Sequence, residues 1–108
     1  MSMLMVPSLM TAGEHYVIQD SPDGPCLVKW LGKESIVDFN LSQELRSVKV
    51  IGEMAFEMNK HIRKVILPEG LTAIRKRALN TCDNLTSVEM PPSVREIGNS
   101  AFNMDRKL

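Results

Sequence analysis

A 23-residue repeat runs through the second half of the chain, in the stretch from Val48 to Val94. Its first unit reads VKVIGEMAFEMNKHIRKVILPEG and its second LTAIRKRALNTCDNLTSVEMPPS, with no insertion between them. A repeat of this length predicts a solenoid, because one unit cannot bury its apolar face alone and must stack on its neighbours. The apolar columns are Val48, Leu71 and Val94; Ile51, Ile74 and Ile97; Ala55, Ala78 and Ala101; Phe56, Leu79 and Phe102; and Ile62, Leu85 and Leu108.

Each unit contains two apolar patterns. Val88 and Met90 alternate with Glu89, which predicts a strand, and Pro91 ends it because proline cannot donate to a ladder. The pattern V-x-x-I-G-x-x-A-F follows, in which Gly98 is expected to allow a sharp turn and the Ala-Phe pair to begin a short helical or 3-10 turn. The predicted fold is an α/β solenoid of stacked parallel strands joined by these turns.

The combined pattern L-x-x-V-x-[LM]-P-x-x-[LV]-x-x-I-G-x-x-A-F, over residues 46–108, resembles the BspA-type leucine-rich repeat. The resemblance implies a right-handed leucine-rich-repeat solenoid. Such proteins are typically bacterial or protozoan surface or secreted proteins that bind other proteins, and the family has no catalytic residues to carry over. The middle repeat departs from the pattern, with Arg75 in the column of Gly52 and Gly98 and Leu79 in that of the phenylalanines. We infer that the glycine column does not require a positive φ.

The chain of 108 residues is expected to form a single domain. Residues 1–13 are predicted to be an apolar tail, either disordered or covering an exposed edge. Residues 14–45 are predicted to be a β-rich N-terminal cap, and residues 46–108 two full leucine-rich repeats and one partial repeat. The tail lacks the basic start of a signal peptide and the roughly 20 apolar residues of a membrane span. The sequence therefore favours the cytoplasm and no membrane insertion, whereas the resemblance implies the cell surface or secretion.

The cap is predicted to be built from strands. Residues 15–18 and 26–31 are β-branched and aromatic and flank the turn sequence S-P-D-G-P, which predicts a β-hairpin. A second turn leads to residues 36–39, so a β-meander is expected. Such a cap would cover backbone groups that the first repeat otherwise leaves unpaired, with Trp30 and Phe39 filling the end of the core.

No constellation of residues predicts catalysis or metal binding. The 13 basic and 13 acidic residues balance, which argues against a whole-molecule field that captures nucleic acid. The two cysteines, Cys26 and Cys82, have no CxxC spacing, and the two histidines have no neighbouring ligands. There is no phosphate-binding glycine loop and no nucleophile motif. We therefore predict no enzymatic activity and no cofactor.

Three surfaces are candidates for binding. The outward strand positions form the first: Arg63, Lys64, Ile66, Thr86, Ser87 and Glu89. A basic patch forms the second: Lys60, His61, Arg75, Lys76 and Arg77. The edge of the last coil forms the third: Asn103, Met104 and Leu108.

Each surface corresponds to one functional hypothesis. The leading one is a non-enzymatic protein–protein interaction module that uses the strand face, where an outward isoleucine is the most informative residue. The alternatives are homo-oligomerisation through the chain ends and weak anion or nucleic-acid binding through the basic patch. A solvated surface is the simpler interpretation of the patch, and nucleic acid is disfavoured because no aromatic residues interleave with the basic ones.

Overall fold

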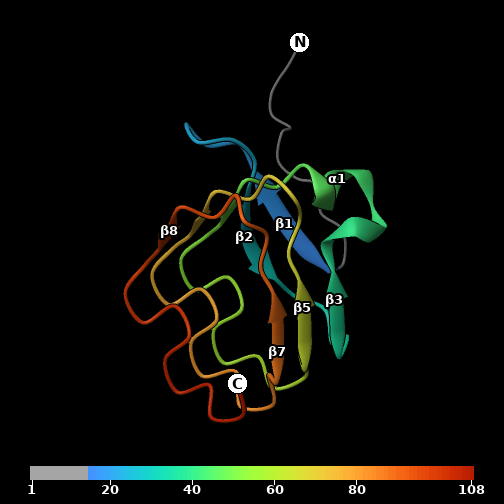
Figure 1. The fold of residues 1–108 in the computed structure, drawn as a ribbon. Helices are drawn as coiled ribbons and strands as arrows, with labels where there is room; N and C mark the ends of the chain where they lie inside the picture. Colours follow the sequence, from blue (N-terminus) through green and yellow to red (C-terminus); the bar gives the residue numbers. More distant parts are fainter. Residues whose placement is uncertain (1–14) are drawn as a thin grey trace.

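The fold is a short solenoid with two sheets as its walls. The computed structural model describes residues 15–108, so the apolar tail predicted for residues 1–13 lies outside the described residues. One sheet has the strand order β1-β2-β4-β6-β8 and the other the order β3-β5-β7 (Figure 1). The elements in chain order are β1 (Tyr16–Gln19), β2 (Cys26–Trp30), β3 (Ile36–Asp38), the 3-10 helix η2 (Phe39–Leu41), α1 (Gln43–Arg46), β4 (Val50–Ile51), β5 (Lys64–Ile66), β6 (Ala73–Ile74), β7 (Ser87–Glu89) and β8 (Glu96–Ile97).

The strand register reproduces the sequence repeat. Val65 on β5 lies beside Val88 on β7, and Ile74 on β6 lies beside Ile97 on β8, both in parallel pairs. Each pair is one 23-residue step apart in the sequence. The predicted stacking of parallel strands is therefore confirmed. Among residues 15–108, no helix is long and apolar enough to cross a bilayer.

The N-terminal cap is a hairpin, but it is not a meander. β1 and β2 pair antiparallel with an irregularity between Val17 and Ile18, as the turn sequence predicted. The prediction that the next strand continues this sheet is wrong, because β3 pairs with β5 in the other sheet. Val37 on β3 is 2% exposed and shares the buried column of Val65. Residues 26–38 thus already form a coil of the solenoid.

The short turns predicted after the glycine column are present as single tight turns and not as continuous helices; the N–H of Ala55, for example, donates to the carbonyl of Gly52, three residues earlier, at 3.2 Å. Met54 and Met58 have φ values of 59° and 63°, so the chain reverses locally before a helical ladder can form. The N–H of Phe56 instead donates to the carbonyl of Ala78 in the next coil at 2.7 Å. We call the stacked segments 52–61, 75–84 and 98–107 the turn wall.

The two helices, η2 and α1, lie between β3 and β4 and were not predicted from the sequence. The Asp38 carboxylate accepts from the N–H of Asn40, and the Ser42 hydroxyl accepts from the N–H of Leu45. Both are ordinary N-cap interactions. Asp38 and Ser42, two residue types that favour the N-cap position, are therefore the sequence signal from which these helices could have been predicted.

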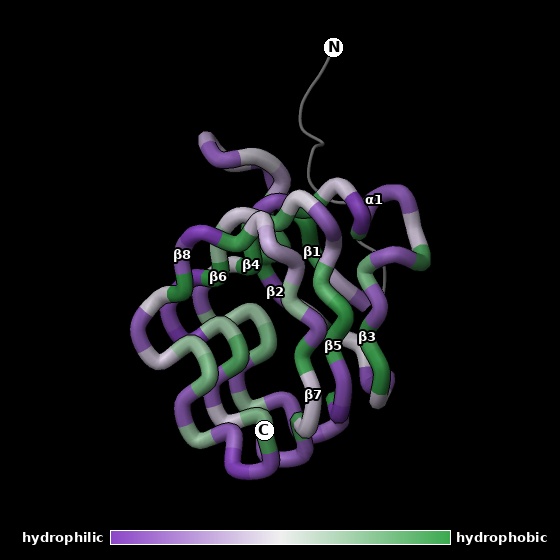
Figure 2. The backbone as a smooth tube through the Cα atoms, in the orientation of Figure 1, coloured by the Kyte–Doolittle hydropathy of each residue, from purple (hydrophilic) through white to green (hydrophobic). Residues whose placement is uncertain are grey.

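The core occupies the space between the two sheets and the turn wall. Ile51, Ala55, Ile62 and Leu71 are fully buried, as the repeat columns predicted. Figure 2 shows hydrophobic stretches along β3 and β5. The large cap residues also pack as predicted, since Trp30 and Phe39 are 8% and 0% exposed.

The glycine column is explained by the close approach of one coil to the preceding coil. Neither Gly52 nor Gly98 has a positive φ, which confirms the inference from Arg75. A Cβ on Gly52 would lie 2.8 Å from the carbonyl oxygen of Leu27, and one on Gly98 would lie 2.6 Å from the backbone nitrogen of Lys76. These glycines let one coil approach the preceding one, and the expectation that Gly98 supplies conformational freedom is not met.

Candidate interaction surfaces

The outer face of β3-β5-β7 brings the predicted strand residues together. Because Val65 points inward, its neighbours Lys64 and Ile66 point outward. The register places Lys64 beside Ser87 and Ile66 beside Glu89. We call this surface the sheet face; it consists of the predicted Arg63, Lys64, Ile66, Thr86, Ser87 and Glu89 together with Ile36 and Asp38.

Polar contacts order the sheet face. The Lys64 ammonium lies 3.1 Å from the carboxylate of Glu89, across the two strands. The Thr86 hydroxyl donates to the carbonyl of Arg63 at 3.1 Å. Both charged groups of the ion pair are partly solvated, so the pair adds little to the free energy of unfolding. Its main effect is to hold the two side chains in position.

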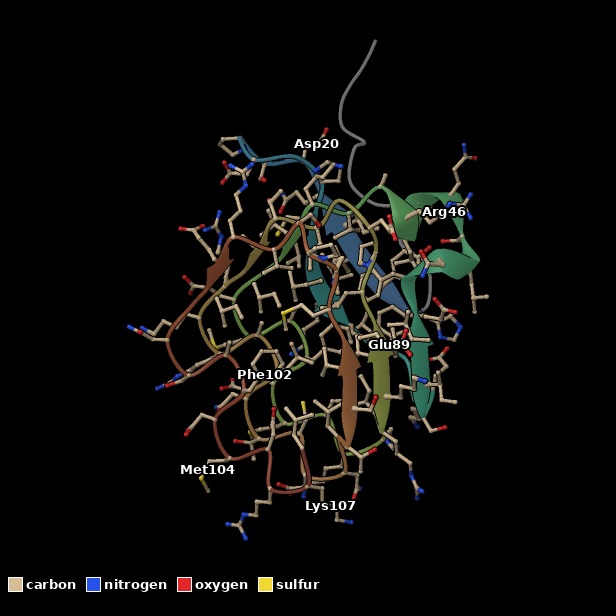
Figure 3. All side chains as sticks on the ribbon, in the orientation of Figure 1. Asp20, Arg46, Glu89, Phe102, Met104 and Lys107 are labelled. Atoms are coloured by element: carbon tan, nitrogen blue, oxygen red, sulfur yellow. The ribbon has the colours of Figure 1, made fainter. Side chains whose placement is uncertain are left out.

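An apolar residue on this face was not predicted. Ile36 is 56% exposed and lies in the row of Lys64 and Ser87. Residues 36–39 were assigned to the cap from the sequence, so they were not counted with the repeats. A shallow groove of about 280 Å³ continues the face, lined by Ile66, Glu89, Met90 and neighbouring prolines. Figure 3 labels Glu89, the last residue of β7, which lies on the sheet face and also lines this groove.

The predicted basic patch is divided into separate parts. Arg75 contributes little free charge, because its guanidinium lies 2.7 Å from a carboxylate oxygen of Asp23 and 2.9 Å from one of Glu96. It thereby connects the hairpin turn to the last coil. Lys76 and Arg77 are exposed on the turn wall.

Lys60 and His61 lie elsewhere, at a hollow of about 370 Å³ that also includes Lys29 and Lys33. Lys29 and Lys33 belong to the cap and are distant in sequence from Lys60 and His61. No local sequence pattern could therefore group the four residues into one surface. Within the described residues, no group of three or more histidine, cysteine or acidic side chains is arranged to hold a metal ion.

The predicted self-association edge is the exposed rim of the last described coil. Met104 and Leu108 are 49% and 51% exposed, and Ile97 on β8 is 53% exposed, although its column mates are buried. Asn103 is exposed and accepts through its backbone carbonyl from the N–H of Thr81. Met104 and Lys107 extend from this coil in Figure 3.

Two titratable groups near this edge have shifted pKa values. Burial raises the pKa of the Cys82 thiol to about 12, with the nearby carboxylate of Asp105 adding to the rise. The thiol is therefore protonated and packs as a small apolar group. Burial also raises the pKa of the Asp105 carboxyl to about 6, against the opposing hydrogen bond from the N–H of Cys82.

Comparisons with known proteins agree with this architecture. The profile of the BspA type leucine rich repeat region (6 copies) matches residues 31–108. A leucine-rich repeat protein of T. pallidum superposes with a TM-score of 0.80 and 26% identity, covering 92% of this chain and 47% of its own. A leucine-rich repeat protein of Bacteroides capillosus gives 0.69 and 25%, covering 85% and 72%. This chain thus spans about half of the first structure, and no curated protein matches its sequence.

Proposed function

Because this chain belongs to the BspA-type leucine-rich repeat family, we propose that it is a non-enzymatic protein-interaction module whose partner docks on the sheet face. The observation that carries the proposal is the exposed Ile36 and outward Ile66 beside the Lys64–Glu89 ion pair. Apolar side chains among ordered charges supply both contact area and specificity in protein interfaces. The strands β3 and β5 beneath the two isoleucines are paired with each other, and their inward residues Val37 and Val65 are buried.

Affinity capture with matched variants tests this proposal. Ile66→Asp and Ile36→Asp place a charge on the sheet face, and we expect each to abolish capture of the partner. Val28→Asp is the control, because Val28 is 37% exposed on the strand β2 of the other sheet. Circular dichroism should show all three variants folded. Capture that survives both sheet-face substitutions, or is lost equally in the control, would show that the partner docks elsewhere.

A second candidate function is self-association through the last coil. It is favoured by the exposure of Ile97 and Leu108, whose equivalents in the earlier coils are buried, and by the exposed Met104 beside them in the last described coil. Strand β8 also lies at the end of its sheet, and an edge strand can pair with a second copy. Light scattering over a range of concentrations should then show a dimer that Ile97→Glu converts to a monomer. A wild-type protein that stays monomeric at high concentration excludes this function.

A further inference from the structure

A hollow exists at the cap because the first coil is shorter than the others. Residues 31–35 connect β2 to β3, whereas residues 52–63 connect β4 to β5. The first coil therefore has no segment that stacks on the turn wall at residues 52–61. Its contacts there include the N–H of Trp30, which donates to the carbonyl of Ala55 at 2.9 Å, and the Lys29 ammonium, which donates to the carbonyl of Met54 at 3.4 Å.

One backbone acceptor in the hollow is left open. In the two later coils, the carbonyls of Asn80 and Asn103 accept from the N–H groups of Met58 and Thr81 in the preceding coil. Glu57 is the equivalent residue of the earlier coil, and its carbonyl has no donor among residues 15–108. An N–H group supplied from outside could therefore bind at this position.

The lining of the hollow is apolar at its base and basic at its rim. Trp30 and Phe56 are buried there, while Leu31 and Met58 are 53% and 61% exposed. The rim contains the cationic or titratable side chains of Lys29, Lys33, Lys60 and His61.

The hollow is lined by three lysines and only one carboxylate, that of Glu57. The Glu57 carboxylate accepts from the side-chain amide of Asn80 at 2.9 Å, and the adjacent Glu34 lies 3.0 Å from His15. These contacts hold the carboxylates in place but do not remove their charge. Because the lysines of the lining outnumber its one carboxylate, the hollow has an excess of positive charge next to exposed apolar surface.

We propose that this hollow binds an extended acidic peptide segment of a partner protein. Carboxylates of the peptide pair with Lys33 and Lys60, its apolar side chains pack on Leu31 and Met58, and one of its N–H groups donates to the carbonyl of Glu57. The peptide takes the place that a turn segment of the first coil would have occupied. The site is separate from the sheet face and does not depend on the function proposed there.

Fluorescence of the single tryptophan provides the test. Trp30 lines the hollow, so its emission reports on occupancy. A short synthetic peptide of glutamates and leucines should produce a saturable change, and the same peptide with lysine in place of glutamate should produce none. The double variant Lys33→Glu, Lys60→Glu should weaken binding by about tenfold or more. The control Lys76→Glu, Arg77→Glu reverses two exposed charges on another coil and should bind as the wild type does.

Two further measurements distinguish the hollow from the sheet face and from a site for free anions. Ile66→Asp lies on the sheet face and should leave peptide binding unchanged. Replacing the leucines of the peptide by serine should weaken binding, because the apolar contacts are lost. Absence of a saturable signal overturns the proposal. It is also overturned if the control variant loses as much affinity as the test variant, or if heparin or inorganic phosphate binds and the peptide does not.

Discussion

At the scale of single residues, one column of the turn wall shows how the same position can perform different tasks. Asn59 accepts, through its side-chain oxygen, from the N–H groups of His61 and Ile62 at 2.8 and 3.1 Å within its own coil. Asp105 reaches instead to the preceding coil, where its Oδ1 accepts from the N–H of Cys82 at 2.7 Å. Its Oδ2 is buried with no partner in the described chain. Removing this carboxylate from water is the reason that its pKa is raised.

Asp105→Asn should stabilise the protein at neutral pH. The folded-state pKa of about 6 exceeds the ordinary value of 3.8, so the folded state binds the proton more tightly. This contribution to stability is complete below pH 3.8 and is lost as the pH rises through 6. Asparagine retains the acceptor without the charge. We expect a gain of up to about 1 kcal/mol at pH 7.5, since the group is partly solvated, and almost none at pH 4.

Urea unfolding of both proteins at the two pH values measures this difference. Asp20→Asn serves as the control, because Asp20 is exposed near the hairpin turn. An equal effect of Asp105→Asn at both pH values would show that the carboxylate is not the cause.

At the scale of elements, an aromatic stack joins the cap to the repeats. The ring of Trp30 on β2 stacks on Tyr16 of β1 and on Phe56 of the turn wall, with centroid separations of 5.6 Å in both cases. Phe39 lies 6.4 Å from both Trp30 and Phe56. The Tyr16 hydroxyl donates to the Glu44 carboxylate of α1 at 2.7 Å, which connects the hairpin to the helix. These four rings close the end of a core that is otherwise aliphatic.

Trp30→Ala should lower the free energy of unfolding by about 3–5 kcal/mol, because it leaves a cavity between the hairpin and the first repeat. Trp30→Phe retains a ring and should cost less than half as much. Chemical denaturation followed by circular dichroism measures both variants, since the fluorescent residue is removed. If Trp30→Ala unfolds with the wild-type midpoint, the stack does not support the cap.

At the scale of the whole molecule, the hydrogen bonds between coils run in different directions in different walls. In the sheets, N–H groups such as that of Gly98 donate to the preceding coil, at 2.7 Å to the carbonyl of Ile74. Along the turn wall, the N–H groups of Arg77, Leu79 and Thr81 donate to carbonyls of the following coil at 2.8–3.0 Å. The equivalent N–H groups of the last coil, on Ser100, Phe102 and Met104, have no acceptor among the described residues. On the turn wall, the two faces of a coil therefore differ chemically, and the last described coil presents there a row of N–H donors that no described carbonyl accepts.

Amide hydrogen exchange should show, residue by residue, which N–H groups of the turn wall are bonded between coils. In a monomer, the amides of Leu79 and Thr81 should be protected, and those of Phe102 and Met104 should exchange orders of magnitude faster, because only the former are bonded between coils. Exchange followed by NMR measures each amide. Equal protection of both sets in a protein that light scattering shows to be monomeric would contradict the assigned bonding. Protection of Phe102 and Met104 that grows with concentration would instead support self-association.

The repeat period explains why much of the fold could be predicted. Its columns identified the buried residues of the inner coils, the strand direction and the outward position of Ile66, because stacking by whole repeats requires equivalent residues to lie side by side. In the last described coil, Ile97 and Leu108 belong to the same columns but are exposed. Residues outside the period were harder to place. Ile36 and Val37 belong to the sheet of β5, yet nothing in their local sequence distinguishes a hairpin partner from a strand of the opposite wall.

The sequence by itself determined the solenoid, its register and its aliphatic core, because these follow from a hydrophobic pattern that repeats every 23 residues. Only the tertiary structure decided three things: that the cap supplies a coil without a turn segment, that Arg75 is neutralised by Asp23 and Glu96, and that Lys29 and Lys33 lie beside Lys60. These depend on contacts between segments distant in sequence, where charge and shape meet only after the chain has folded.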